Sequence, residues 1–250
     1  MVALPALLMT LRPPATTPTP DDGPVETLVI LSPHRREVRL EYDRAFAAWM
    51  RTHHQRNVRI EWLDAGGTSK LLKFLESQFA ANSNAPGVHV LFGGGIAPYL
   101  IAREKGWLQP LPLASNVLAG IPPHCAGAPV YDPDSHWFGV ALSGFGIVYN
   151  QPLLDRLHLS PPATWEDLGQ PAYFTWLSSG DPRSSGSVHM CYEIILQAMG
   201  YEAGWDLITR LCANVRSFGE GGGVAPREVA AGDAVAGMVI DQYAQTVIDA

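Results

Sequence analysis

The sequence predicts an α/β protein of two lobes. From Glu26 onward, short β-rich runs alternate with amphipathic helical segments, which is the pattern of parallel sheets with crossover helices. The alternation stops in a stretch rich in proline and small residues, residues 107–136, and then begins again. A chain of 250 residues with 47% hydrophobic residues is long enough to bury a core in each of two such units.

The first half of the chain predicts three strands with a helix between each pair. The strands are expected at residues 27–31, 58–62 and 88–92, and each ends in a loop or turn of small residues. Thr68 or Ser69 is expected to cap the second helix. The apolar face of the first helix is expected to comprise Val38, Tyr42, Ala45, Phe46 and Trp49. Because open α/β sheets bind ligands beyond the carboxyl ends of their strands, the loops are candidate binding segments.

The second half repeats this organisation. Two strand-like pieces, residues 138–142 and 146–149, mark the expected crossing from one lobe to the other. Thr164 is expected to begin a short helix, with Asp167 as its capping-box partner. Further elements are expected as strands at residues 174–178 and 235–240 and as a helix at residues 203–212.

These patterns divide the chain into three parts. Residues 1–25 are expected to be a signal remnant and a Pro/Thr-rich spacer, residues 26–141 the first lobe, and residues 142–250 the second lobe. The start of the chain is uncharged and mostly apolar, but it is too short to span a bilayer and lacks basic residues. The sequence therefore predicts a damaged signal peptide and an exported, periplasmic protein.

Composition excludes several classes of function. The net charge of −7 leaves no broad basic face for nucleic acid, and no segment is apolar for long enough to cross a membrane. Cys125, Cys191 and Cys212 lack the paired short spacing of a zinc or iron–sulfur site. We therefore expect no cofactor and no nucleic-acid partner.

Two helix starts are rich in small hydroxyl residues and glycine. Residues 184–187 read Ser-Ser-Gly-Ser before a helix, and residues 66–69 read Gly-Gly-Thr-Ser in the first half. The first turn of a helix offers free N–H groups and a partial positive charge, which suit a phosphate or a carboxylate. Both could equally be ordinary N-caps, because serine and threonine are common there. Neither has the Gly-Lys-Ser/Thr ending of a nucleotide-hydrolysing loop.

Other candidate groups lie at the ends of strands. His34 follows the first strand and could donate to a ligand or a metal, while Asp241 and Tyr243 are expected to end the last strand and could bind a cation or sugar hydroxyls. Each could also be structural. An enzyme that uses Cys191 or His34 is the rival hypothesis, but His189 and Cys191 point away from each other on a helix.

Several segments resemble one family of proteins. Residues 28–34, 66–69 and 90–95 look like the first lobe of family 1 extracellular solute-binding proteins. The second half is similar to the ferric-iron-binding branch of that family at residues 143–150, 164–168, 181–187 and 237–243. The resemblance implies a type II periplasmic-binding fold, in which two lobes close about a hinge and deliver a ligand to a membrane permease.

The resemblance also implies where iron would bind. The iron-binding branch uses a first-lobe histidine and an adjacent pair of tyrosines, which His34 and Tyr243 would match in part. Gln242 stands where the second tyrosine would be, so only one phenol is present. Ferric iron needs several hard oxygen donors, so we expect a different ligand. Members of the family continue beyond the strand that precedes Tyr243, so the second lobe is expected to be truncated at its C-terminal end.

The expected function is that of the substrate-binding component of an ABC importer. It would be a monomer that captures a small anionic solute, phosphorylated or phosphonate-bearing, between its lobes and passes it to the permease. The alternatives are a ferric-iron-binding protein, with His34 and Tyr243 as metal ligands, and an enzyme or sensor domain on the same fold. The candidate ligand-binding residues are Ser32, His34, Gly67, Thr68, Ser69, Gly94, Gly95, Ser143, Gly144, Ser185, Gly186, Ser187, Asp241 and Tyr243.

Overall fold

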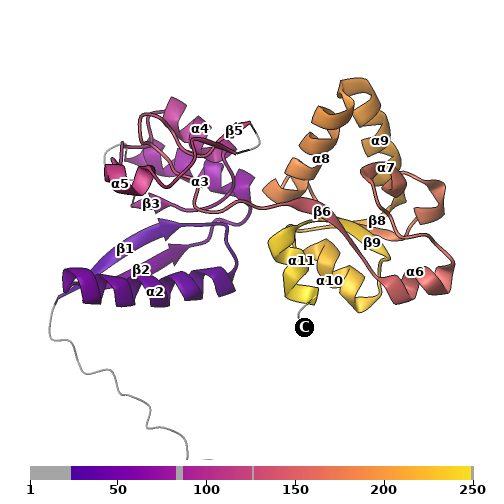
Figure 1. Ribbon diagram of the computed structural model, residues 1–250, viewed down its shortest axis with the longest axis horizontal. Coiled ribbons are helices and arrows are strands. Elements are labelled where there is room, and N and C mark those ends of the chain that lie inside the picture. The colour runs from indigo at the N-terminus through magenta and orange to yellow at the C-terminus, as the bar shows by residue number, and fades with distance from the viewer. Residues whose placement is uncertain (1–23, 83–86, 126, 249–250) are drawn as a thin grey trace, which may run out of the picture.

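The computed structural model describes residues 24–82, 87–125 and 127–248, and places two α/β lobes side by side (Figure 1). The expected signal remnant and most of the spacer, residues 1–23, lie outside the described residues. Among the described residues, no helix combines the length and the apolar character that a membrane span requires.

The first lobe is built on a three-stranded parallel sheet in the order β2-β1-β3. Its strands are β1 (Val25–Leu31), β2 (Asn57–Leu63) and β3 (Val90–Leu91). Helix α2 (Arg36–His54) covers one face, while α3 (Thr68–Ala81) and α4 (Ala97–Glu104) lie on the other (Figure 1). Each crossover returns the chain to the same end of the sheet, so the loops after the strands gather along one edge.

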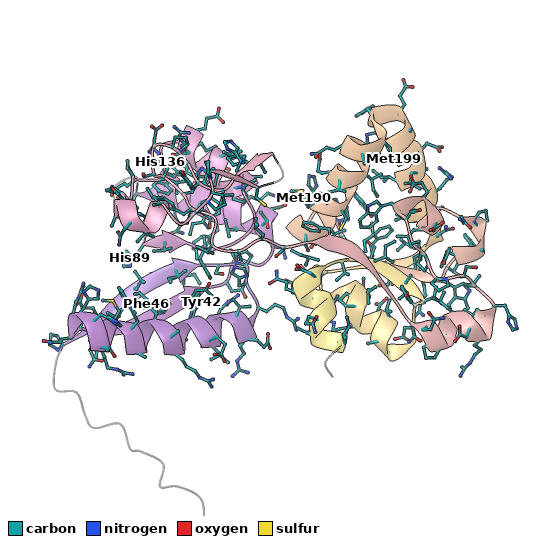
Figure 2. All side chains as sticks on the ribbon, in the orientation of Figure 1. Tyr42, Phe46, His89, His136, Met190 and Met199 are labelled. Atoms are coloured by element: carbon teal, nitrogen blue, oxygen red, sulfur yellow. The ribbon has the colours of Figure 1, made fainter. Side chains whose placement is uncertain are left out.

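The core of the first lobe is small. Leu31, Leu71 and Leu75 are buried together between the sheet and α3. On α2, the ring of Tyr42 reaches Phe92 at a centroid distance of 4.7 Å, on the side of the helix that faces the sheet (Figure 2). The predicted apolar face of α2 is nevertheless only partly covered, since 44% of Tyr42 and 48% of Trp49 remain exposed.

The stretch between the lobes is mostly irregular, as its proline content predicts. It contains a short helix and one small hairpin, α5 (Ser115–Leu118), β4 (His124–Cys125) and β5 (Ala128–Pro129). It is tied to α4 by Arg103, whose guanidinium pairs with the buried carboxylate of Asp132 at 2.7 Å. His136 donates its backbone N–H to the same carboxylate, and its ring Nδ1 lies 2.8 Å from it.

The described chain passes from one lobe to the other through residues 139–144 (Figure 1). A strand at residues 138–142 was the wrong prediction, because only Phe138 makes an isolated bridge, with Tyr131. Val140 and Leu142 are 69% and 72% exposed, and residues 139–144 belong to no strand. The boundary predicted between residues 141 and 142 lies in this segment and stays a prediction.

The second lobe has a mixed four-stranded sheet in the order β6-β9-β7-β8. β6 runs antiparallel to β9, and β7 runs parallel to both β9 and β8. The strands are β6 (Phe145–Tyr149), β7 (Leu177–Gly180), β8 (Val215–Gly219) and β9 (Ala236–Ile240). In Figure 1, α8 and α9 lie over one face of this sheet, and α10 and α11 lie on the opposite side.

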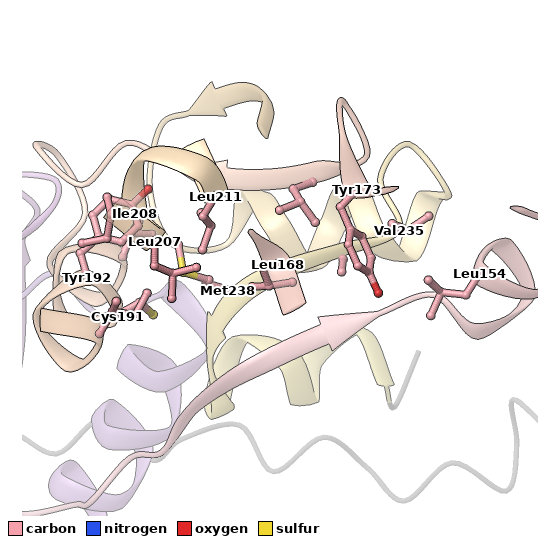
Figure 3. Packing of buried hydrophobic residues seen from close by; sticks show 14 residues of the cluster. Leu154, Leu168, Tyr173, Cys191, Tyr192, Leu207, Ile208, Leu211, Val235 and Met238 are labelled. Carbon is pink, nitrogen blue, oxygen red and sulfur yellow. The ribbon is translucent and has the colours of Figure 1, made fainter. Parts of the chain in front are cut away.

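The helices of the second lobe enclose the larger core (Figure 3). They are α6 (Gln151–Leu157), α7 (Trp165–Leu168), α8 (Gly186–Met199), α9 (Tyr201–Asn214), α10 (Val224–Ala231) and α11 (Asp241–Ile248), with a 3-10 turn at Pro171–Tyr173. The α8–α9 pair contributes Ile195, Leu207 and Leu211, all buried. The predicted capping box of α7 is confirmed, with Thr164 and Asp167 as its two members.

Two elements of the second lobe begin later or differently than predicted. The strand expected at residues 174–178 starts at Leu177. The 3-10 turn and the left-handed conformation of Thr175, φ 65°, prevent the chain from being extended before that residue. Asp241 and Tyr243 do not end a strand. They belong to the first turns of α11, which starts as β9 ends.

Candidate functional site

The starts of α3 and α8 face each other across the two lobes. A Cβ atom on Gly67 would lie 1.8 Å from the carbonyl oxygen of Ser184, and one on Gly186 would lie 2.4 Å from the hydroxyl oxygen of Thr68. Backbones can approach this closely only where glycine stands. The two helix N-termini that the sequence marked as anion-binding candidates are therefore brought together, one from each lobe.

The start of α3 differs from the prediction in its cap. Gly67, not Thr68 or Ser69, holds the N-cap position, and no side chain caps the helix. The turn before it depends on Gly66, which has a φ of 87°. Thr68 is the first helical residue, and its hydroxyl points toward Gly186 instead of back into its own helix. The first N–H groups of α3 therefore have no partner within the helix.

The start of α8 is organised by two hydroxyls. Ser185 is the N-cap, and its hydroxyl accepts a long hydrogen bond of 3.4 Å from the N–H of Val188. The same hydroxyl lies 3.1 Å from that of Ser187. Ser185 is buried. The two hydroxyls therefore form one polar pair at the start of α8.

A glycine loop between β8 and α10 closes this side of the site. A Cβ atom on Gly222 would lie 2.2 Å from the hydroxyl of Ser187, 3.2 Å from that of Ser185 and 2.9 Å from a ring carbon of Tyr243. Gly222 was not among the predicted site residues. The four glycines among residues 219–223 were the available signal, because glycine at a strand often marks close backbone approach.

His34 and Ser32 lie in the loop after β1 and differ in how far they are buried. The imidazole of His34 packs on Phe92, with ring centroids 5.0 Å apart, and its Nε2 would lie 2.4 Å from a Cβ atom on Gly93. Burial first, and then the charge of Arg39, lowers the pKa of His34, so the ring is neutral at pH 7. Ser32 is fully buried, and its hydroxyl accepts from the N–H of His34 at 3.1 Å. Ser32 therefore stabilises the backbone of this loop.

Tyr243 and Asp241 lie at the first-lobe side of α11. The guanidinium of Arg35 lies 5.2 Å from the centroid of the Tyr243 ring and donates to the hydroxyl of Thr246 at 3.1 Å. Burial raises the pKa of the Tyr243 phenol, and the nearby charge of Arg35 only partly offsets this. The carboxylate of Asp241 accepts the N–H of Gly144 at 2.8 Å, so it fastens α11 to the start of β6.

The remaining predicted residues are less central. Gly94 belongs to the cluster, since a Cβ atom there would lie 3.6 Å from the hydroxyl of Thr68. Ser69, Gly95 and Ser143 are exposed, and a Cβ atom on Gly95 would meet nothing within 4 Å. The structure thus gathers Gly67, Thr68, Gly94, Ser185, Gly186, Ser187 and Tyr243, and leaves these three at the periphery.

Three cations at the edge of the first lobe were also missed. Arg35 and Lys70 reach residues of the second lobe, and Arg39 lies beneath the loop after β1. None of the three was among the predicted site residues. The contacts of Arg35 and Lys70 depend on how the two lobes pack, and those of Arg39 depend on the pairing of β1 with β2. A helical pattern contains neither kind of information.

The rival nucleophile does not meet this cluster. The thiol of Cys191 is buried in the core of the second lobe, and burial raises its pKa to about 12. His189 lies on the same helix but pairs with Glu193. A thiol with this pKa is protonated at neutral pH and is a poor nucleophile.

Two sequence relatives resemble parts of the chain. The phosphoglycerate transport regulatory protein PgtC of Salmonella typhimurium is 39% identical over 115 residues, which are 44% of this chain and 28% of PgtC. An uncharacterised protein of Haemophilus influenzae is 28% identical over 165 residues, which are 63% of this chain and 45% of that protein. The alignments therefore span less than half the length of either relative.

Solved structures share the fold over most of the chain. The periplasmic binding protein AfuA from Actinobacillus pleuropneumoniae, with fructose-6-phosphate bound, has a TM-score of 0.69 at 19% identity, over 91% of this chain and 67% of AfuA. Iron-bound HitA from Pseudomonas aeruginosa has a TM-score of 0.67 at 20% identity, over 90% of this chain and 66% of HitA. These similarities establish the predicted two-lobed, type II periplasmic-binding fold. Because the family model of bacterial extracellular solute-binding proteins also matches residues 85–249, which are more than half of the sequence, the chain belongs to that family.

Proposed function

We propose that this protein captures a small phosphorylated or phosphonate-bearing solute between its lobes and delivers it to the permease of an ABC importer. The observation that carries the proposal is the meeting of the α3 and α8 starts, through Gly67 beside Ser184 and Gly186 beside Thr68. Each helix start carries about half a unit of positive charge and several free N–H groups. Two such ends, together with the hydroxyls of Ser185 and Ser187, suit the oxygens of one phosphate.

The relatives support the same class of ligand. PgtC is named for phosphoglycerate transport, and AfuA is described with fructose-6-phosphate bound. The identity to PgtC is higher than that to the solved binding proteins, which are similar to this chain in fold. A phosphate monoester is the chemical group that these two descriptions have in common.

Ferric iron fits the charges of the site less well. HitA is described as iron-bound, and His34 and Tyr243 could serve as two metal ligands. However, Arg35 lies over the Tyr243 ring, and burial favours the protonated phenol over the phenolate that iron requires. A cation at this position would be repelled by Arg35, whereas an anion would be attracted.

Ligand screening by calorimetry and thermal shift distinguishes the two ligands. The probes are fructose 6-phosphate, 3-phosphoglycerate and phosphonoacetate. Fructose and glycerate are the unphosphorylated controls for the first two probes, and ferric citrate tests for iron binding. A ligand at 100 times its Kd stabilises the folded protein by about 2.7 kcal/mol. We expect stabilisation by at least one phosphorylated probe and none by its unphosphorylated partner. Stabilisation by iron alone would contradict the proposal.

The site itself is tested by Ser185→Asp. A carboxylate at the start of α8 places a negative charge where the phosphate is proposed to bind, so the affinity for a phosphorylated probe should fall by at least about tenfold. Ser115→Asp adds the same charge at the start of the distant helix α5 and should leave affinity unchanged. Equal affinities for the wild type and Ser185→Asp would remove this end of α8 from the site.

The cellular part of the proposal is an exported protein of the periplasm that acts as a monomer beside a membrane permease. It rests on family membership. Fractionation of cells that express the native reading frame checks the location. Recovery of the protein in the cytoplasmic fraction would contradict it.

A further inference from the structure

We propose that Arg39 is a positioning residue, which joins two binding loops of the first lobe and thereby sets the place of the α3 start. These are the β1 loop, residues 32–35, and the β2 loop, residues 64–67. The inference rests on the proposed function, because its affinity measurement uses a phosphorylated ligand. Its second measurement, hydrogen exchange in the two loops, needs no ligand and does not rest on the proposed function.

Arg39 lies in the second turn of α2, directly beneath the β1 loop. Its Nε donates to the carbonyl oxygen of His34 at 2.6 Å, and its Nη2 donates to that of Ser32 at 3.3 Å. The same Nη2 donates to a carboxylate oxygen of Asp64 at 2.6 Å. Only 15% of the Arg39 side chain is exposed, whereas Arg44 on the same helix is 74% exposed. One guanidinium therefore binds three acceptors from two loops.

Asp64 carries this connection to the start of α3. Its second carboxylate oxygen accepts the N–H of Gly66 at 2.8 Å. Burial opposes ionisation of Asp64, but the hydrogen bonds from Arg39 and Gly66 together hold its pKa below the ordinary range. The carboxylate is therefore ionised at neutral pH and fixes Gly66, whose left-handed backbone turns the chain into Gly67.

Gly67 is the residue that meets the second lobe. The position of a Cβ atom on Gly67 is only 1.8 Å from the Ser184 carbonyl oxygen, so a small displacement of the β2 loop changes how closely the α3 start can approach α8. The hydrogen bonds of Arg39 described above all go to acceptors of the first lobe. Its effect on the ligand must therefore pass through the two loops that it holds.

Arginine suits this task better than lysine. A planar guanidinium has donors in a fixed fork and can bind several acceptors at defined angles, whereas an ammonium is a compact point charge on a flexible stem. Arg39→Lys keeps the positive charge near the site but cannot reproduce the three bonds. The two variants Arg39→Lys and Arg39→Gln therefore separate geometry from charge.

The test compares Arg39→Lys, Arg39→Gln and Asp64→Asn with the wild type, and Arg44→Gln is the matched control on the exposed side of α2. Amide hydrogen exchange is measured first on the ligand-free protein. We expect faster exchange at residues 32–35 and 64–68 in the three test variants, with unchanged exchange in α8 and α9. In Arg44→Gln, whose partner is the exposed Glu41, the loops should exchange as in the wild type.

Affinity is then measured by calorimetry with fructose 6-phosphate and 3-phosphoglycerate. Removal of hydrogen bonds from a charged group should weaken binding by about 10- to 100-fold in both Arg39→Lys and Arg39→Gln. If Arg39→Lys binds as the wild type does, or if the loops exchange at wild-type rates in all three variants, the positioning role is wrong. If the wild type binds neither probe, the proposed ligand class fails, and the exchange result alone decides whether Arg39 holds the loops.

Discussion

Lys70 of α3 and Glu220 of the β8–α10 loop form an ion pair between the two lobes, with Nζ and Oε1 2.5 Å apart. Lys70 lies in the first turn of α3, and Glu220 lies two residues from Gly222 in the glycine loop. Both side chains are exposed, and the pair joins the lobes beside the candidate site. This ion pair joins α3 to the β8–α10 loop, whereas Arg35 joins the β1 loop to α11.

Reversal of one charge in this pair is expected to weaken closure. Lys70→Glu places two carboxylates together, and the affinity for a phosphorylated probe should fall. The effect should be up to about fivefold at low salt, because exposed pairs contribute little, and it should shrink at high salt. Lys70→Glu combined with Glu220→Lys should recover most of the loss. Calorimetry at two ionic strengths measures both effects.

The control for this prediction is an ion pair that stays within one lobe. Lys105 and Glu76 lie 2.9 Å apart, both in the first lobe, and are similarly exposed. Lys105→Glu should leave ligand affinity at the wild-type value. A double reversal at Lys70 and Glu220 that binds no better than Lys70→Glu would show that the pair does not act across the lobes.

Gly186→Ala should abolish tight ligand binding without weakening the second lobe. The added Cβ would lie 2.4 Å from the hydroxyl oxygen of Thr68, so the lobes could not close fully. Alanine is a better helix former than glycine, by up to about 1 kcal/mol, so the helix itself should not suffer. Gly146→Ala adds a methyl group that meets nothing within 4 Å and should bind as the wild type does.

Small-angle scattering and calorimetry together check this prediction. The Gly186→Ala variant should remain in a more open form when a phosphorylated probe is added, while its melting temperature without ligand stays close to that of the wild type. Full closure and unchanged affinity in this variant would mean that the close approach of α3 and α8 is not part of binding.

Asn214→Ala should destabilise the second lobe by about 2–3 kcal/mol. Its side-chain amide is buried and donates to the carbonyl oxygens of Leu168 and Gln170, at 2.8 and 2.7 Å. Alanine would leave both carbonyls without these donors. Urea unfolding followed by tryptophan fluorescence measures the loss, and Glu202→Ala, at an exposed position of the same helix, should change the free energy of unfolding by no more than about 0.5 kcal/mol.

The buried carboxylate of Asp132 predicts an acid-sensitive first lobe. Burial opposes its ionisation, but hydrogen bonds from His136 and the charge of Arg103 outweigh this and lower its pKa. A lowered pKa in the folded state stabilises the protein above the ordinary carboxyl pKa of about 3.9, and this contribution is lost as pH falls further. Asp132→Asn should therefore be less stable than the wild type at pH 7, and the difference should shrink below about pH 4.

Thermal unfolding between pH 3 and pH 7 measures this difference. Asp134→Asn is the control, because Asp134 also pairs with Arg103 but is largely exposed, and its effect should be small at every pH. A stability difference for Asp132→Asn that is the same at pH 3 and pH 7 would contradict the assignment.

Local patterns in the sequence predicted the parts of the fold that depend on near neighbours. The capping box of Thr164 and Asp167, and the helix start at Ser185, involve residues three apart. The strand expected at residues 138–142 failed because a strand also needs a neighbour, and a local run of apolar residues cannot show whether one is present. The position of Asp241 on α11 was missed because strand and helix follow each other there without a loop.

The same distinction applies to the candidate site. Glycine and hydroxyl residues at two helix starts were visible in the sequence, and the structure brings Gly67 and Gly186 to the same place. Arg39 was not found, because its three acceptors lie at different sequence separations and become neighbours only when β1 and β2 pair. Contacts across the lobes, such as Arg35 with Thr246, depend on a separation of 211 residues and have no local signal.

The described lobes are joined covalently by one exposed segment, residues 139–144. Within the described residues, this tether keeps the two halves of the site at an effective concentration of roughly millimolar. A protease cut in this segment would separate the two described lobes, so that closure becomes an encounter between them. Their association would then depend on protein concentration, and ligand would act as a cross-link between them.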